Sequence, residues 1–329
     1  MKAANFLGEN KINIVEKEAP HLEFENDVIV EVNCCGLCGS DKRLFREGAK
    51  HTPGHEISGT IYKKGKDVKL RIGQRVIIYI PIYCGKCKFC EVGNTNQCQN
   101  IKELVGWQRS GGYAEYVKVP EQNVIPIPDD ISDEDGVLLL DTIGTAAHAV
   151  RLAMPTLKNK EENTLVIGCG PLGLGMILVL KAFGFNNIFA TDISPEKLDL
   201  SKSFGAIPIQ SDTNKQKNQF KFVVEASGSS SGRETGLYSV EPGGSLVILG
   251  ESNDPFIINP NPILRRKDFY TIRSFYFPLN EVNENIELYK SNKESFRKLI
   301  SEIVGFDNLQ NTFIKFCESK TIKPFIKMK

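Results

Sequence analysis

Four of the nine cysteines are packed into one short segment, in the pattern C-x2-C-x2-C-x7-C. They are Cys84, Cys87, Cys90 and Cys98. Four thiolates in one loop can converge on a single tetrahedral ion, and Zn²⁺ is the usual occupant of a closed four-sulfur site. Such a site has no open position, so we expect this zinc to be structural. An iron–sulfur cluster and a loop of reduced cysteines are the alternatives, and the complete set of four favours zinc.

A second group of metal-binding side chains is spread over the first 141 residues. Cys38 lies in the segment G-L-C-G-S-D, and His55 and Glu56 lie in the segment G-H-E. A catalytic zinc takes about three protein ligands and leaves one position for water or substrate. Cys38 and His55 supply thiolate and imidazole donors, while Glu56 and Asp141 are candidate oxygen donors. Taken singly, each is more often a buried cysteine, a core histidine or a surface acid.

A glycine-rich turn, G-x-G-x-x-G, follows the apolar run 165–167 and precedes a helical stretch. Its first glycine permits a tight turn, its second lets the backbone approach a pyrophosphate, and its third allows close packing of helix on strand. The N–H groups at the start of the helix can bind the phosphates. The cofactor-binding residues expected here are Gly168, Gly170, Pro171, Leu172 and Gly173.

Asp192 ends the next strand-like run, nineteen positions after Gly173. A carboxylate there accepts hydrogen bonds from both ribose hydroxyls and repels a 2′-phosphate. No arginine follows within the next few residues to bind such a phosphate. The turn and Asp192 therefore predict binding of NAD, with NADP disfavoured. The alternative is a structural strand–turn–helix unit with a solvated aspartate.

Composition excludes several classes of protein. With 41 Lys and Arg against 40 Asp and Glu, the chain has no net field to attract nucleic acid or an anionic membrane. A zinc ribbon that binds nucleic acid would need a basic, aromatic surface. Lys86, Lys88 and Lys102 are too sparse to form one. We see no apolar run near the roughly 20 residues of a spanning helix and no signal peptide at the start. The cysteines then suggest metal binding in a reducing compartment, the cytoplasm.

The elements that must position these residues fall into two kinds. Short β-branched runs separated by Gly, Pro and Asn fill the first ~140 residues, for example 28–32, 75–80 and 113–119. From 165 onward, apolar strands alternate with helices, at about 187–191, 206–210, 221–225, 245–249 and 270–276. That alternation predicts an α/β fold with a doubly wound parallel sheet. We expect one domain over 146–279, and a β-rich domain over 1–145 to which 280–329 returns.

Taken together, the motifs resemble those of the zinc-dependent medium-chain dehydrogenases and reductases, the superfamily of alcohol and polyol dehydrogenases that includes sorbitol and threonine dehydrogenases. The signature G-H-E-x2-G-x5-G-x2-V is intact from Gly54 to Val68. The G-x-C-G-S-D segment, the four-cysteine lobe, the run G-G-Y-A-E-Y at 111–116, the glycine-rich turn and Asp192 follow in the family's order. The resemblance covers nearly the whole chain. It implies a GroES-like catalytic domain and an NAD-binding Rossmann domain.

The resemblance also implies roles for individual residues. The catalytic zinc would be held by Cys38, His55 and Asp141, with Glu56 ligating the ion or lying just behind it. Ser40 would pass on the substrate proton. In the coenzyme domain, Thr145 would pack beside the nicotinamide and Lys197 would hydrogen-bond the ribose. With the four-cysteine lobe, this makes two zinc ions per chain.

One position departs from the family's pattern. Many members carry a histidine five positions after the first zinc cysteine, where it ends the proton relay, and this chain has Arg43 there. A guanidinium does not titrate and cannot accept that proton. We therefore expect the relay to run through a ribose hydroxyl and water, or through His51. Ile80, Trp107 and Arg109 are candidate substrate-pocket residues, in loops of variable length.

The substrate stays open among several alternatives. A polyol, sugar or secondary alcohol is favoured, and a threonine-type or sugar-specific enzyme, for example one acting on an aldose or cyclitol, is the runner-up. A zinc- and NAD-binding redox sensor without turnover is the alternative from another class. Nucleic-acid and membrane partners are not expected. The strand at 270–277 should lie at a sheet edge, where an unpaired strand favours a homodimer or homotetramer.

Overall fold

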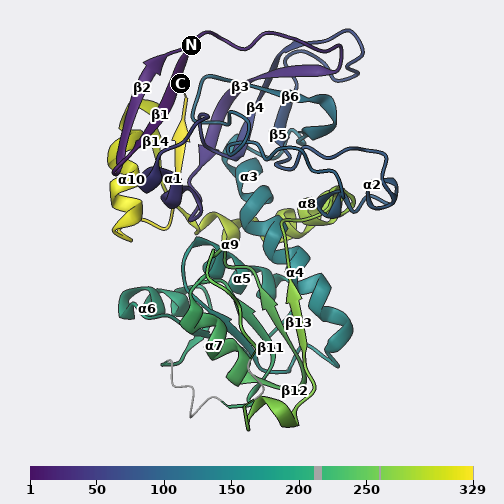
Figure 1. Cartoon of the computed structure of the whole chain (residues 1–329), viewed down its shortest axis with the longest axis vertical. Helices are drawn as coiled ribbons and strands as arrows, with labels where there is room; N and C mark the ends of the chain where they lie inside the picture. Colours follow the sequence, from purple (N-terminus) through teal and green to yellow (C-terminus); the bar gives the residue numbers. More distant parts are fainter. Residues whose placement is uncertain (211–216, 259–260, 329) are drawn as a thin grey trace. The chain divides into compact units, whose positions relative to one another are not determined.

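The computed structural model describes residues 1–210, 217–258 and 261–328 (Figure 1). The chain forms two compact units. The first comprises Met1–Asp141, Pro278–Asn280 and Arg297–Lys329, and the second comprises Thr142–Phe277 and Glu281–Phe296. The sequence-based division differs from these units in three places. It put the first boundary after 145, it assigned 278–279 to the second domain, and it assigned all of 280–329, including 281–296, to the first domain.

The first unit is built on a seven-stranded sheet in the order β14-β15-β3-β4-β5-β7, with β6 also paired to β3. Its strands are β3 (Asp27–Gly36), β4 (Glu56–Lys64), β5 (Arg75–Ile78), β6 (Tyr116–Pro120), β7 (Val124–Pro126), β14 (Ile300–Gly305) and β15 (Lys323–Lys327). A separate hairpin joins β1 (Lys2–Gly8) to β2 (Lys11–Glu16). Eight of the ten residues of β3 are buried, because strands flank it on both sides and helices cover it.

Short helices close the first unit. They are α1 (Asp41–Glu47), α2 (Lys88–Glu91), α3 (Asp133–Leu138) and α10 (Leu309–Cys317). An aromatic cluster joins elements from both ends of the chain. The Phe6 ring stacks on Tyr113 with centroids 5.9 Å apart, and Phe313 of α10 meets Phe6 edge-on at 5.1 Å. This packing fixes the C-terminal helix against the N-terminal strands.

The second unit holds a six-stranded sheet in the order β10-β9-β8-β11-β12-β13. Every neighbouring pair in it is parallel. The strands are β8 (Thr164–Ile167), β9 (Ile188–Thr191), β10 (Ile207–Pro208), β11 (Phe220–Glu225), β12 (Val240–Ile248) and β13 (Tyr270–Arg273). The order places the first strand beside the fourth, so the strand order reverses between β8 and β11. This confirms the doubly wound sheet, and β13 lies at its edge as predicted.

Three helices connect strands of this sheet: α5 (Pro171–Ala182), α6 (Pro195–Ser203) and α7 (Ser230–Ser239). Helix α4 (Thr145–Ala153) precedes β8, and α8 (Val282–Ser291) and α9 (Lys293–Arg297) follow β13. Helix α8 stays with this unit because Arg151 of α4 binds Glu281 and Asn285 at 2.6 and 2.9 Å. Short 3₁₀ turns lie at η1 (Thr95–Gln97), η2 (Glu121–Asn123), η4 (Met154–Thr156), η5 (Leu264–Arg266), η6 (Leu279–Glu281) and η7 (Phe306–Asn308).

One helical stretch, Asp133–Thr156, is long and apolar enough to cross a membrane by length and composition. Of its apolar window, 78% is buried inside the protein, which is the property of a core helix. The stretch corrects the expectation that no apolar segment reaches this length. It is not a straight helix, because α3 and α4 are joined by the π-helical turn η3 (Leu139–Gly144), where Leu140 has non-helical dihedrals (φ −77°, ψ −107°).

Candidate metal centres and nucleotide-binding turn

The side chains of Cys38, His55, Glu56 and Asp141 meet in the first unit. One ligand atom from each lies within 4.8 Å of those of the other three. Strands β3 and β4 pair antiparallel with Gly36 opposite Glu56, so the end of one strand meets the start of the other. This pairing brings Cys38, just after β3, next to His55, just before β4. Asp141 reaches the cluster from η3, and its Oδ2 lies 3.1 Å from Cys38 Sγ.

Asp41 orients the histidine of this cluster. Its side chain is fully buried, and its Oδ1 approaches His55 Nδ1 to 3.2 Å, an ion-pair distance without hydrogen-bond alignment. Its Oδ2 accepts hydrogen bonds from the Tyr113 hydroxyl at 2.9 Å and from the backbone N–H of Cys38 at 3.2 Å. A carboxylate behind one ring nitrogen fixes the tautomer and leaves the other nitrogen free for a metal.

The charge around His55 also favours cation binding. Burial alone would lower the pKa of His55, but the Asp41 carboxylate and the Cys38 sulfur outweigh it and raise that pKa well above its usual value. Burial of the sulfur and the neighbouring Asp141 raise the pKa of Cys38 to about 11, although His55 opposes them. The surroundings are thus rich in acceptors and anions, and a divalent cation would stabilise the thiolate there.

Glu56 is bound from behind by a lysine of the C-terminal strand. Lys323 of β15 donates from Nζ to Glu56 Oε1 at 2.5 Å and to the carbonyl of Leu37 at 3.1 Å. Glu56 is fully buried, and its Oε2 has no hydrogen-bond partner among the residues that the structure describes. Burial raises the pKa of Glu56 to about 7 even though Lys323 opposes that shift.

The donor set fits a catalytic zinc. It combines a thiol, an imidazole and two carboxyl groups, with a buried carboxylate oxygen that the protein itself leaves unpartnered. Soft and borderline donors of this kind suit zinc, whereas an all-oxygen set suits Mg²⁺ or Ca²⁺. Ser40 lies beside the cluster and donates from Oγ to Cys38 Sγ at 3.3 Å.

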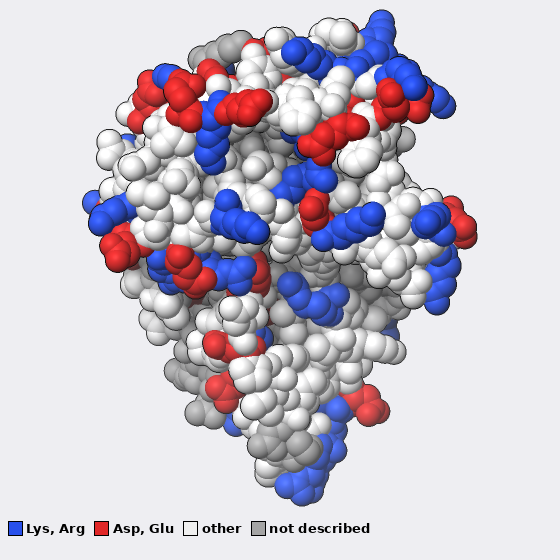
Figure 2. Space-filling view, turned by 45° about the horizontal axis from the view of Figure 1, so that its top comes forward, with Lys and Arg blue, Asp and Glu red and all other residues white. Residues whose placement is uncertain are grey.

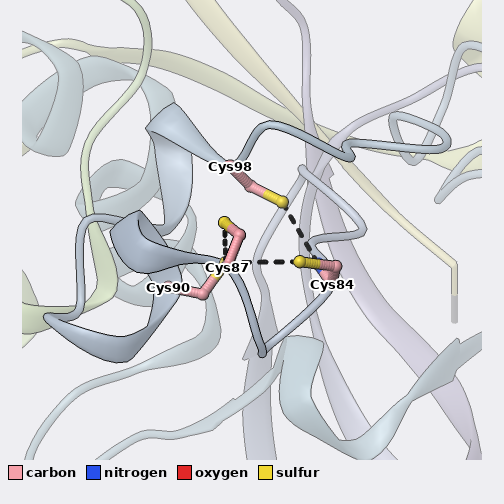
Figure 3. Close-up of side chains that lie close together, drawn as sticks. All are labelled: Cys84, Cys87, Cys90 and Cys98. Atoms are coloured by element: carbon pink, nitrogen blue, oxygen red, sulfur yellow. Dashed lines mark hydrogen bonds between the residues drawn. The ribbon is translucent and has the colours of Figure 1, made fainter.

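The four cysteines of the lobe also meet, as Figure 3 shows. Their sulfur atoms all lie within 4.8 Å of one another, and the Cys87 and Cys90 sulfurs are 3.5 Å apart. Backbone N–H groups point at the sulfurs: that of Cys84 donates to Cys98 Sγ at 3.2 Å. Backbone donors, first that of Cys90, lower the pKa of Cys87 to about 6. The set fits one closed four-sulfur site.

The lobe contacts the segment on which the chain returns to the first unit. Thr95 of η1 accepts at Oγ1 from the backbone N–H of Leu279 at 3.0 Å, and it also bonds the Tyr79 hydroxyl at 2.8 Å. Asn280 donates to the carbonyl of Val92 at 3.3 Å. The loop that carries the four sulfurs therefore also holds this return segment in place.

The glycine-rich turn links β8 to α5 in the second unit. Gly168 has φ +93°, and a Cβ there would lie 2.8 Å from the backbone nitrogen of Ser227. A Cβ at Gly173 would lie 1.8 Å from the carbonyl oxygen of Gly168. At Gly170 a Cβ would meet nothing within 4 Å, so the space expected for a phosphate is open. Pro171 and Leu172 form the first turn of α5.

Asp192 follows β9, the strand next to β8. Its Oδ2 accepts from the backbone N–H of Cys169 at 2.6 Å and its Oδ1 from that of Ser194 at 2.8 Å. The carboxylate is thereby fixed next to the glycine-rich turn. Lys197 lies in the first turn of α6, and Thr145 is the buried first residue of α4.

Other residues singled out from the sequence have definite surroundings. The Trp107 ring stacks on His55 with centroids 6.0 Å apart, and the Arg43 guanidinium lies 5.1 Å from the Trp107 ring centre. Arg109 binds Glu103 through Nε at 2.7 Å. His51 is half-buried in the loop between α1 and β4. Trp107 is thus a wall of the metal cluster, whereas Arg109 is engaged in an ion pair.

Sequence reasoning missed three residues that support the cluster. Asp41 and Tyr113 lie inside the quoted motifs G-x-C-G-S-D and G-G-Y-A-E-Y, yet neither received a role. Lys323 gave no signal at all, because nothing in the run T-I-K-P-F-I-K marks one lysine as buried. A histidine ligand does need a carboxylate behind it, so an acid near Cys38 could have been sought.

Comparisons with known proteins agree with this geometry. The alcohol dehydrogenase GroES-like domain matches residues 25–129, and the zinc-binding dehydrogenase domain matches residues 171–291. An L-threonine 3-dehydrogenase from Rhizobium etli is 34% identical over 73% of this chain and 73% of its own length. A probable D-xylulose reductase A from Aspergillus clavatus is 29% identical over 97% of this chain and 94% of its own.

A solved structure is similar over the full chain. Galactitol-1-phosphate dehydrogenase from Escherichia coli has a TM-score of 0.88 and 27% identity, and the match covers 99% of this chain and 100% of that one. The domain matches and the relatives together assign the chain to one enzyme family. The chain belongs to the zinc-binding alcohol and polyol dehydrogenases, oxidoreductases that act on CH–OH groups.

Proposed function

We propose that this enzyme transfers a hydride between NAD and the hydroxyl-bearing carbon of a polyol, sugar or secondary alcohol, with one catalytic and one structural zinc ion per chain. The cluster of Cys38, His55, Glu56 and Asp141 carries the proposal, because a thiol, an imidazole and carboxyl groups converge beside a serine hydroxyl.

The chain's own residues supply orientation and proton transfer. When bound, the zinc ion stabilises negative charge on the substrate oxygen as a Lewis acid, and NAD accepts the hydride. Ser40 relays the hydroxyl proton, accepting it at Oγ as its own hydroxyl proton moves onward, and Asp41 keeps the His55 ring in the orientation that ligation requires. In the second unit, Thr145 contacts the nicotinamide, the glycine-rich turn binds the pyrophosphate, and Asp192 and Lys197 bind the ribose.

Arg43 occupies the position where a histidine would end the proton relay, and a guanidinium does not titrate and cannot accept the substrate proton. The proton would therefore leave through a ribose hydroxyl of the bound cofactor and water, or through His51. The His51→Ala variant separates the two routes. An unchanged pH–rate profile would exclude the route through His51, while a shifted profile would support it.

Two further features complete the proposal. Strand β13 is an exposed sheet edge, with Tyr270 57% exposed, and we infer that a second copy of the chain pairs there in a homodimer or homotetramer. Size-exclusion chromatography with light scattering tests the oligomer, and a monomer at micromolar concentration would contradict it.

The nine cysteines are all unpaired, which supports a reducing compartment, the cytoplasm.

A substrate panel tests the activity. NAD reduction is measured with polyols, sugars, secondary alcohols and L-threonine, and each active substrate is repeated with NADP. The similarity to an L-threonine 3-dehydrogenase makes a threonine-type activity the second candidate. Turnover of polyols or alcohols supports the first proposal, and turnover of L-threonine alone supports the second. Both proposals would be contradicted if zinc-loaded protein formed NADH with none of the substrates in the panel.

A further inference from the structure

Lys323 is a buried cation at the rear of the metal cluster. Its side chain is 2% exposed, and Nζ donates to Glu56 Oε1 and to the carbonyl of Leu37. The register of β15 on β3 explains its position: Phe325 lies opposite Gly36, so continuing the antiparallel pairing sets Lys323 level with Cys38. Lysine is rarely fully buried unless it is paired with an anion.

Acidic groups surround Lys323. Its Nζ is paired with the buried Glu56 carboxylate, and Cys38 and Asp141 lie in the same cluster as Glu56. These three are also the acidic members of the candidate ligand set. Lys323 is therefore part of the charge balance of the metal site, although it cannot itself be a ligand while protonated.

Glu56 is shared between the lysine and the cluster. Its Oε1 is bound by Lys323, while its buried Oε2 has no hydrogen-bond partner and lies over Gly36, where a Cβ would come within 2.4 Å. A buried, unpartnered carboxylate oxygen is costly. Only one of the two oxygens has a partner among the described residues, and one carboxylate oxygen of Glu56 lies within 4.8 Å of the other candidate ligand atoms.

We propose that Lys323 is a positioning residue that sets how strongly Glu56 ligates the catalytic metal, by holding one carboxylate oxygen away from it. This rests on the proposed metal centre. Three acidic ligands and a divalent ion sum to one negative charge, to which the buried Asp41 behind His55 adds another, and the ammonium of Lys323 offsets one of these charges. With Lys323 in place Glu56 is a partial ligand, and a coordination position stays open for the substrate oxygen.

Removing the lysine then has an unusual consequence. In Lys323→Met both oxygens of Glu56 are free to bind the metal, and the site carries one more uncompensated negative charge. The metal should be held more tightly and should polarise the substrate less. A lysine that only anchored β15 would have the opposite effect, because loosening the strand would loosen the ligands and release the metal faster.

The experiment measures metal exchange and coordination in the full-length protein. The protein is loaded with Co²⁺, and the absorption band that disappears in Cys38→Ser is assigned to the catalytic site. In Lys323→Met we expect loss of this cobalt to a chelator to slow about tenfold, the usual scale for groups behind a metal ligand. We also expect a weaker band, as four-coordinate cobalt gains a ligand, and a fall in kcat larger than any change in KM.

A double-mutant cycle shows whether the effect passes through Glu56. In the Glu56→Gln background, Lys323→Met should leave the cobalt band unchanged, and cobalt release should slow much less than in the wild-type background, because only the loss of the lysine charge remains. Lys323→Arg keeps the charge and should resemble the wild type. If Lys323→Met does not fold, Lys323→Gln, a neutral donor, should slow cobalt release in the same direction. Faster release in Lys323→Met or Lys323→Gln would overturn the proposal.

The proposal and the proposed metal centre fail in different ways. If Cys38→Ser leaves every cobalt band intact, the catalytic metal site itself is wrong. If Cys38→Ser removes a band but Lys323→Met shows unchanged or faster release, the metal site stands and the role of Lys323 is wrong. A change of the cobalt band, or an undiminished slowing of release, when Lys323→Met is made in Glu56→Gln would likewise contradict action through Glu56.

Discussion

Cys38 is the residue on which the proposed chemistry depends most directly. Its sulfur contacts both Asp141 and Ser40, so it joins the ligand set to the proton-transfer hydroxyl. We expect Cys38→Ser to lower kcat by about a thousandfold or more, because Lewis-acid stabilisation contributes several kcal/mol and 1.36 kcal/mol is tenfold. Steady-state kinetics and circular dichroism are the measurements. Loss of the folded signal together with activity would show a structural role instead.

Asp41 acts through His55. In Asp41→Asn the side chain keeps its shape but loses the charge that faces Nδ1, so we expect catalytic metal affinity to fall about 10–100-fold. Tyr113→Phe is the matched control, because it removes the hydroxyl that binds the other carboxylate oxygen and leaves the His55 contact intact. Chelator competition measures both variants. Equal losses of affinity in the two would mean that the buried network, and not the charge facing His55, is what matters.

Asp192 is the proposed selector between the two nicotinamide cofactors. Its carboxylate is fixed by two backbone N–H groups beside the turn. Asp192→Ala removes the group that repels a 2′-phosphate, so the ratio of kcat/KM for NAD to that for NADP should fall about tenfold or more. Glu196→Ala, an exposed acid of α6, is the control. An unaltered cofactor ratio in Asp192→Ala would show that another residue selects.

At the scale of elements, we propose that the four-cysteine lobe stabilises the fold and takes no part in the chemistry. Its loop binds the segment that contains Leu279 and Asn280. Cys87→Ser should lower Tm by several degrees, since each kcal/mol shifts the midpoint by roughly 2–4 °C in domains of 150–250 residues. Residual kcat per folded molecule should stay near that of the wild type. Cys317→Ser, at an exposed cysteine of α10, is the control. An unchanged Tm in Cys87→Ser would argue against a structural metal.

Strand pairing explains how the elements assemble the catalytic cluster. The β3–β4 pair brings Cys38 to His55, the kinked turn η3 presents Asp141, and β15 delivers Lys323 from near the end of the chain. The first two contacts join segments whose motifs are recognisable in the sequence. The contact of Lys323 with Glu56 could not be recognised in this way, because which strand pairs with β15 depends on the fold of the whole unit.

At the scale of the whole molecule, the metal content is the simplest test. Metal analysis of the purified chain should return two zinc ions per chain, one for each cluster. Cys38→Ser and Cys87→Ser should each retain one. A single zinc in the wild type would remove either the structural or the catalytic assignment, and the variant that still binds it would show which.

The surface is mixed in charge, as the composition predicts. On the face shown in Figure 2, Lys and Arg side chains are interspersed with Asp and Glu. The most apolar stretch, Asp133–Thr156, is used internally, because it leads from α3 through the Asp141 turn into α4. Its apolar side chains are mostly buried inside the protein. The break at Leu140 lies next to Asp141, the candidate ligand that reaches the metal cluster.

Short-range signals in the sequence determined the nature of each site. The spacing of Cys84 to Cys98, the G-H-E motif and the glycine-rich turn with Asp192 all depend on local geometry, in which neighbours along the chain are neighbours in space. The alternation of strands and helices similarly determined the doubly wound sheet. These features could be predicted because each is specified within a few tens of residues.

The tertiary structure alone decided the surroundings of those sites. Asp41 and Tyr113 behind His55, Trp107 beside it, and Lys323 behind Glu56 come from segments up to 267 positions apart. Burial turns these ordinary polar groups into a connected network, because removal from water makes each one need a partner. Residue types and local spacing therefore indicate which ligands exist, whereas the fold determines which charges act on them.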